Sequence, residues 1–272
     1  FKLTPDQNNA VKQINSDIAS KERMFRLLQG DVGSGKTIVS LIAASNIIMN
    51  KYQVAFMAPT EILAKQHFKL FLKIFGNTYK SDLLTGKIEN KKRNNILLNL
   101  KNKKIDIIFG THSLFQKKIE FKKLGLIIID EQHKFGVNQR KKLSEKGDIN
   151  SDVLVMSATP IPRTMMMTLY GDMDITLIKS KPKNRKEIKT YTKDVNKIDE
   201  VIKFIKNEIA NNNQVFWVCP LIEKSKKLDH QSSVSRYKYL KNIFKDKIGL
   251  LHGLINNEEK NKILNNFLNI DI

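Results

Sequence analysis

The architecture of this chain follows from the run Gly30-Asp31-Val32-Gly33-Ser34-Gly35-Lys36-Thr37, which fits the pattern G-x-x-x-x-G-K-[ST]. The apolar run 24–28 precedes it, and a segment with helical periodicity follows. A strand that turns through glycines into a helix leaves backbone N–H groups and the positive helix end pointing at one spot, where a polyphosphate can bind. The run therefore predicts a nucleoside triphosphate site, in which Lys36 reaches the β- and γ-phosphates and Thr37 ligates Mg²⁺.

The composition limits the class of protein and suggests its partner. The 272 residues are enough for one large or two medium domains, each with its own core. The net charge of +21 favours a polyanionic partner such as nucleic acid, although an AT-rich coding sequence would also produce the excess of Lys, Asn and Ile. The single cysteine, Cys219, excludes an internal disulfide, and no apolar run is long enough to span a membrane. We therefore expect a cytoplasmic protein without a membrane partner.

Short apolar runs recur along the chain, and nearly every one ends in a small or polar turn. Several are apolar at consecutive positions, which is typical of strands covered on both faces. Helix-length segments lie between them. We expect strands at 25–29, 53–57, 81–84, 105–109, 124–129, 153–156, 214–218 and 248–251. The alternation of strand and helix predicts a parallel α/β sheet.

Polar residues follow most of these runs, at the point where each predicted strand ends. Ligands of open α/β sheets bind outside the carboxyl ends of the strands, so these turns are expected to share one edge of the sheet. The turns are Gly30-Asp31, Ala58-Pro59-Thr60, Gly110-Thr111-His112, Asp130-Glu131 and Ser157-Ala158-Thr159.

Two adjacent acids, Asp130 and Glu131, end the buried run 124–129. In a fold with a phosphate-binding loop the first acid holds the Mg²⁺ that Thr37 also touches. The second acid can orient or deprotonate the attacking water. One acid would suggest binding alone, whereas the pair predicts hydrolysis of the nucleotide.

The strand-end motifs resemble those of the superfamily 2 helicases. Asp130-Glu131-Gln132-His133 is similar to the DExH box of that superfamily, Leu3-Thr4-Pro5-Asp6-Gln7 to its Q-motif, and Ser157-Ala158-Thr159 to its motif III. The longer strings 59–67, 130–137, 158–164 and 218–223 resemble the RecG family of bacterial ATP-dependent branch-migration helicases. The resemblance runs across essentially the whole chain.

The RecG resemblance implies a fold and a set of partners. The fold would be a RecA-like parallel sheet sandwiched by helices over 1–179, followed by a linker at 180–186 and a partial second RecA-like domain at 187–272. The nucleotide would be ATP, with Mg²⁺ as its ion. The partner would be branched double-stranded DNA, such as forks and Holliday junctions, bound by a monomer that remodels it in recombination and repair.

The same resemblance implies roles for single residues. Gln7 would select adenine, and the catalytic residues would be Lys36, Asp130, Glu131 and His133. Ser157 and Thr159 would report the state of the γ-phosphate to the DNA groove. The DNA backbone would lie against Thr60, Thr111, His112 and Arg163. For Arg140 a contact with a DNA phosphate or a domain interface and a salt bridge within its own domain stay open as equal alternatives.

RecG proteins also have an arginine finger and a wedge domain, which the resemblance places outside this sequence. An arginine finger contributes roughly 10³ to 10⁵ in rate. We therefore expect the chain alone to bind ATP, to hydrolyse it slowly and to unwind nothing. Two alternatives remain: another superfamily 2 translocase, such as the transcription-repair coupling factor, which usually carries Glu where Gln132 stands, or a non-catalytic module that binds ATP and DNA.

Overall fold

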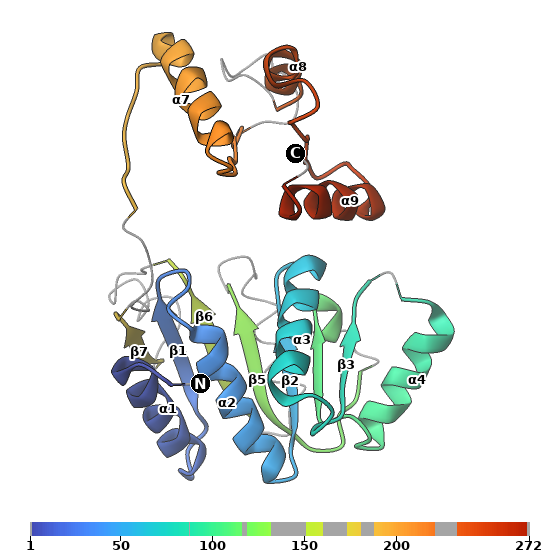
Figure 1. Ribbon diagram of the computed structural model, residues 1–272. Helices are drawn as coiled ribbons and strands as arrows, with labels where there is room; N and C mark the ends of the chain where they lie inside the picture. Colours follow the sequence, from blue (N-terminus) through green and yellow to red (C-terminus); the bar gives the residue numbers. More distant parts are fainter. Residues whose placement is uncertain are drawn as a thin grey trace. The chain divides into compact units, whose positions relative to one another are not determined.

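The chain divides into two compact units, residues 1–186 and 187–272. A computed structural model, drawn in Figure 1, describes residues 2–86, 88–115, 119–131, 151–159, 173–180, 188–220 and 233–270. No helix within these ranges is both long enough and apolar enough to cross a membrane. The two units are described separately below.

Unit 1 contains a seven-stranded sheet in the order β3-β4-β2-β5-β6-β1-β7. Every neighbouring pair of strands is parallel. The strands are β1 (Phe25–Gly30), β2 (Gln53–Met57), β3 (Ser81–Leu84), β4 (Ile107–Gly110), β5 (Leu124–Asp130), β6 (Asp152–Ser157) and β7 (Asp174–Ile178). The predicted parallel α/β fold is therefore confirmed. One strand, β7, was not predicted from the sequence; it is an edge strand of the sheet.

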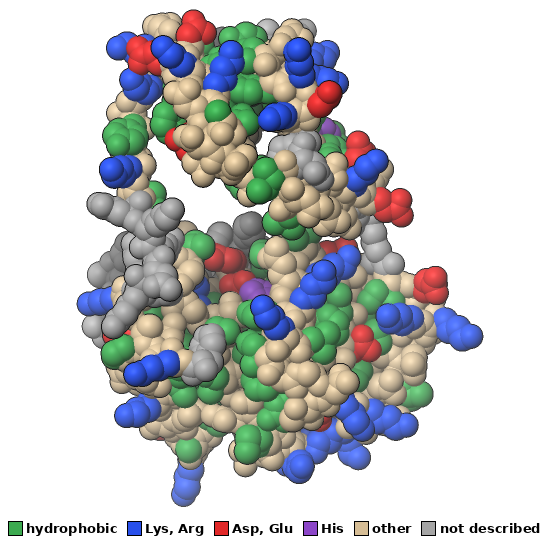
Figure 2. Space-filling view, viewed as in Figure 1, with side chains coloured by type: hydrophobic (Ala, Val, Ile, Leu, Met, Phe, Trp, Pro, Cys, Tyr) green, Lys and Arg blue, Asp and Glu red, His purple; other side chains and the backbone are tan. Residues whose placement is uncertain are grey.

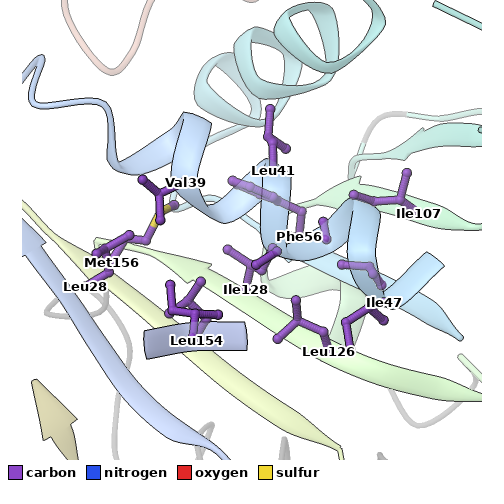
Figure 3. Close-up of a cluster of buried hydrophobic side chains, with 14 of the residues drawn as sticks. Leu28, Val39, Leu41, Ile47, Phe56, Ile107, Leu126, Ile128, Leu154 and Met156 are labelled. Carbon is purple, nitrogen blue, oxygen red and sulfur yellow. The ribbon is translucent and has the colours of Figure 1, made fainter. Parts of the chain in front are cut away.

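Helices cover both faces of this sheet, and one apolar core lies on each face. The helices are α1 (Pro5–Ile18), α2 (Lys36–Met49), α3 (Glu61–Phe75) and α4 (Asn90–Lys101). On one face, side chains of α1, α2 and α3 pack against alternate strand residues. Figure 3 shows α2 side chains such as Val39 beside strand residues such as Leu28 and Ile128. On the other face, Ile96 and Leu100 of α4 pack against the residues in between. Both faces of β5 are buried, which explains its unbroken apolar sequence.

Local signals fix where the site-bearing helices begin. Thr4 and Gln7 form a reciprocal capping box at the start of α1, since each side chain bonds the other residue's backbone N–H. Thr60 caps α3 by accepting a hydrogen bond from Leu63 N at 3.3 Å. The cap of α2 is Gly35, whose φ of 90° is the left-handed conformation that glycine adopts without strain. All three helices begin on the side of the sheet where the carboxyl ends of the strands lie (Figure 1).

Unit 2 is helical in its described part, with η3 (Val195–Lys197), α7 (Ile198–Ala210), α8 (Ser233–Phe244) and α9 (Asn257–Leu268). The expected strands at 214–218 and 248–251 are wrong, because both segments are irregular. They line a cavity of about 510 Å³ together with side chains of α7, α8 and α9. A strand needs a hydrogen-bonded partner, and within the described residues of unit 2 neither run has a ladder to join.

Candidate active site

The phosphate-binding loop connects the end of β1 to the start of α2. At two of its glycines the surrounding atoms leave no room for a Cβ atom. A Cβ on Gly30 would lie 2.7 Å from Ser34 Oγ and 2.9 Å from the carbonyl oxygen of Ile178. A Cβ on Gly35 would collide with the side-chain amide of Gln7. The loop can therefore close tightly against both β7 and α1 only because these positions lack side chains.

Hydrogen-bond donors gather inside this loop. Lys36 folds back over it, and its Nζ donates to the carbonyl oxygens of Gly30 at 2.6 Å and Asp31 at 3.2 Å. The hydroxyl of Ser34 is buried and has no hydrogen-bond partner among the described residues. A buried polar atom without a partner is costly, and here it lies beside the N-terminal end of a helix. The donor set fits a phosphate group.

Asp130, the last residue of β5, and Glu131 directly after it both influence Lys36. Burial lowers the pKa of the Lys36 ammonium, and the charges of Glu131, Asp130 and Asp31 offset part of that shift. The loop and the acidic pair, about a hundred residues apart in the sequence, therefore form one site. Figure 2 shows acidic and histidine atoms adjoining at this edge of unit 1.

Asp130 and Glu131 are held by different contacts. Asp130 is buried, and its Oδ2 lies 2.8 Å from Nε2 of His67 in α3. Glu131 has a φ of 53°, a left-handed conformation that costs a non-glycine residue about 1–2 kcal/mol. Its backbone N–H donates to the carbonyl of Met156 at 3.0 Å, and its Oε1 accepts a hydrogen bond from Ala158 N at 3.3 Å. The end of β5 is thus tied to the turn after β6.

The turn after β6 is also tied to β1. Ser157 and Thr159 lie with their hydroxyl oxygens 3.0 Å apart, and Thr159 N donates to Ser157 Oγ at 3.2 Å. Nε2 of the buried Gln29 donates to the carbonyl of Thr159 at 2.9 Å. Gln29 directly precedes the loop, so the carboxyl ends of β1, β5 and β6 form one hydrogen-bonded unit.

Gln7 closes the loop from the side of α1. Its Oε1 accepts from Thr4 N at 2.9 Å, and its Nε2 donates to the carbonyl of Ser34 at 2.7 Å. The preceding Asp6 accepts hydrogen bonds from the backbone N–H groups of Ser180 and Lys179, at 2.7 and 3.0 Å. The bond from Ser180 is the main reason that the pKa of Asp6 lies below its usual value. The segment expected to bind adenine is therefore anchored to the loop and to the chain after β7.

The residues predicted to contact DNA differ in their exposure. Thr60 is exposed at the start of α3. Thr111 is only 5% exposed, and its hydroxyl lies 3.3 Å from Ser113 Oγ. His112 begins the short helix η1 (His112–Phe115). The predicted site residues His133 and Arg163, together with Arg140, lie outside the described residues.

Two residues of the site were not predicted from the sequence. His67 lies seven positions after Thr60, on the same face of a helix, and this spacing could have indicated that it faces the strand ends. Gln29 is a polar residue at the end of a buried apolar run, which could have marked it as a functional position.

Comparison with known proteins identifies the family. The model of the DEAD/DEAH box helicases matches residues 4–168. The chain belongs to this family. Over 98% of its length this helicase chain is 45% identical to the ATP-dependent DNA helicase RecG of Bacillus subtilis, and it is also 45% identical to RecG of Thermotoga maritima. It spans 39% and 34%, respectively, of the length of these relatives.

Solved structures agree with this membership. The helicase chain is similar to the structure of RecG bound to a three-way DNA junction, with a TM-score of 0.77 and 39% identity over 97% of this chain and 35% of that one. The DEAD-box helicase Mss116 shares the fold, with a TM-score of 0.68 and 20% identity, over 97% of this chain and 58% of that one. The homology with RecG therefore extends through both units.

Proposed function

We propose that the chain is the ATP-binding part of a RecG-type DNA helicase, which uses ATP hydrolysis to remodel branched DNA in recombination and repair. The observation that carries this proposal is the pair of hydrogen bonds that joins Glu131 to the turn after β6, and that turn to Gln29 directly before the loop. It brings the phosphate-binding loop and the DExH acids into one site, as hydrolysis of a nucleotide requires.

Residues of the loop bind the nucleotide, and the acids at the end of β5 act in its hydrolysis. Lys36 and the backbone N–H groups of the loop bind the phosphates, and Gln7, which is hydrogen-bonded to the loop, would select adenine. Glu131 orients or deprotonates the attacking water. The Glu131–Ala158 contact keeps this carboxylate in a fixed direction.

Mg²⁺ is the ion that fits the site. Asp130 and Thr37 offer carboxylate and hydroxyl oxygens, the hard ligands that Mg²⁺ prefers. Asp130 and Thr37 would hold the ion, which would supply positive charge that neutralises the phosphates.

DNA would be bound along the edge of the sheet that carries Thr60, Thr111 and His112, with Arg163 as a further contact. Thr60 is exposed at the N-terminal end of α3, where backbone N–H groups favour a phosphate of the DNA backbone. Thr111 is too buried for its hydroxyl to meet the DNA without a local rearrangement, so we assign Thr60 the larger contribution.

The turn formed by Ser157 and Thr159 would carry the signal from nucleotide to DNA. It is bonded to the acid that faces the phosphates and to the residue before the loop. Loss of the γ-phosphate would change both contacts at once. In this proposal the protein acts in the cytoplasm as a monomer.

The test is ATP hydrolysis by the protein that contains this chain, measured without DNA, with linear duplex and with a four-way junction. We expect the junction to stimulate hydrolysis more than the duplex does. Lys36→Ala should abolish turnover, whereas Lys12→Ala, at an exposed position of α1, should not. Hydrolysis that is insensitive to both DNA substrates, or that survives Lys36→Ala, would contradict the proposal.

A further inference from the structure

His67 lies beside the metal-binding acid, although it belongs to none of the motifs that define the nucleotide site. Its Nε2 is 2.8 Å from Oδ2 of Asp130, and each of the two residues is only 8% exposed. An ionised carboxylate can only accept hydrogen bonds, so beside ionised Asp130 the ring nitrogen is the donor. A short bond from a buried donor fixes the direction in which the other carboxylate oxygen points.

The imidazole ring of His67 packs against aromatic side chains of the core. Its centroid is 4.7 Å from that of Phe56 in β2, and Phe56 stacks on Phe109 of β4 at 5.1 Å. Both phenylalanines are completely buried. A ring packed against a close-packed core does not turn freely, so His67 offers its N–H to Asp130 in one orientation.

The helix that carries His67 begins at the DNA-facing edge. Thr60 caps α3, and His67 lies seven residues further along, about 10 Å away on the same face of the helix. Phe68 and Phe71 of α3 pack on Phe109, which keeps the helix against the sheet (Figure 1). Movement of Thr60 along the helix axis would therefore reach Asp130 through a rigid element.

We infer that His67 is a positioning residue, which holds the Asp130 carboxylate in its metal-binding direction and links it, through α3, to the DNA contact at Thr60. The inference rests on the proposed function, because it needs a metal–nucleotide complex at Asp130 and DNA at Thr60. His67 would act through Asp130 and would touch neither nucleotide nor DNA.

The first test measures metal binding rather than turnover. Mn²⁺ replaces Mg²⁺, and its binding in the presence of ADP is followed by electron paramagnetic resonance. His67→Phe keeps a ring against Phe56 but has no N–H, and we expect it to weaken Mn²⁺ binding about 10- to 100-fold, as is usual for the loss of a partner of a metal ligand. Binding of ADP without metal should not change. His67→Gln, whose amide can still donate, should recover part of the loss.

The control is Gln66→Leu, an exposed position next to His67 on α3. It should bind Mn²⁺ as the wild type does. If His67→Phe binds Mn²⁺ with wild-type affinity, the inference is wrong. A wild-type protein that binds neither ADP nor Mn²⁺ would instead contradict the proposed function.

The second test uses the wild-type protein alone, so it does not depend on whether a variant folds. In the wild-type protein the ¹⁵N resonance of His67 Nε2 should shift when Mg²⁺ and ADP are added, and should shift again when a four-way junction is added. A resonance that does not respond to the junction, in a protein that binds the junction, overturns the link between Thr60 and Asp130.

Discussion

Oε1 of Glu131 accepts a hydrogen bond from the backbone N–H of Ala158 at 3.3 Å, so the acid that we propose to be catalytic and the turn after β6 are in direct contact. Substitution by Gln keeps an oxygen for this bond but removes the charge and the base. We expect Glu131→Gln to bind ATP normally and to lower turnover by about 10²- to 10⁴-fold, the range for loss of a general base. Nucleotide binding is measured by fluorescent ATP titration and turnover by phosphate release.

The matched control is Glu22→Gln, at an exposed position before β1. It should change neither quantity. Unchanged turnover in Glu131→Gln would refute the role of this residue.

Gly30 touches Ser34 on one side and the backbone of β7 on the other. In Gly30→Ala the new methyl group would push against the carbonyl of Ile178, which cannot rotate away as a side chain can. We expect a loss of about 1–3 kcal/mol in the free energy of unfolding, as for other overpacked sites, and weaker ADP binding. Urea denaturation and ADP titration measure the two effects.

Gly86→Ala is the corresponding control, because its Cβ would meet only Glu61 Oε1 at 3.4 Å. Equal urea midpoints for the two variants would show that the loop has room for a side chain at Gly30.

Gln53 is completely buried at the start of β2, and its side-chain amide makes four hydrogen bonds to backbone groups. Nε2 donates to the carbonyls of Leu100 and Ile105, both at 2.9 Å, and Oε1 accepts from the N–H groups of Lys122 and Lys123. Gln53→Leu would remove all four of these hydrogen bonds, and of the four backbone groups the carbonyl of Leu100 would keep its bond from the N–H of Lys103. We expect a destabilisation of at least about 3 kcal/mol, or roughly 6–12 °C in the melting temperature of unit 1.

Differential scanning calorimetry tests this prediction. Gln66→Leu makes the same chemical change at an exposed position and should leave the melting temperature unchanged. A melting temperature of Gln53→Leu equal to that of Gln66→Leu would contradict it.

Asp152 is the first residue of β6 and lies at the end of that strand away from the nucleotide site. Burial raises its pKa from 3.8 to about 6. Met24 N–H donates to its Oδ1 at 2.8 Å, which offsets only part of the effect. Because the folded state holds this proton more tightly than the unfolded state, the stability from Asp152 is present below about pH 4 and is lost as the pH rises through about 6.

Asp152→Asn keeps the acceptor for Met24 and removes the charge. We expect it to be more stable than the wild type at pH 8, by about 1 kcal/mol after allowance for solvent screening, and equally stable at pH 4. Urea denaturation at both pH values measures the difference. A variant that is less stable than the wild type at pH 8 would show that the charge of Asp152 is favourable.

The sheet of unit 1 was predictable because its strands are buried on both faces, so apolar residues occur at consecutive positions. β7 was missed for the opposite reason: it lies at the edge, where Leu177 is 49% exposed and Thr176 interrupts the apolar run. The apolar runs at 214–218 and 248–251 resemble strands but line a cavity between helices, and an apolar run alone does not specify a hydrogen-bonded partner.

The site was predictable where its chemistry depends on local spacing. The loop has fixed glycine positions, and Asp130 and Glu131 follow directly from a buried strand. His67 and Gln29 act through contacts with residues 63 and 130 positions away, which no local pattern encodes. The predicted roles of His133 and Arg163 stay predictions.

The position of β1 between β6 and β7 has a consequence for how the protein folds. Phe25 pairs with Val153 and Arg26 with Asp174, so the strand that leads into the phosphate-binding loop has both its neighbours far along the chain. During synthesis β1 has no sheet to join until the segment containing β6 has emerged from the ribosome. Pairings of such long range close late and slowly. We therefore expect the ability to bind nucleotide to be acquired late in the folding of unit 1, once β1 has paired with β6.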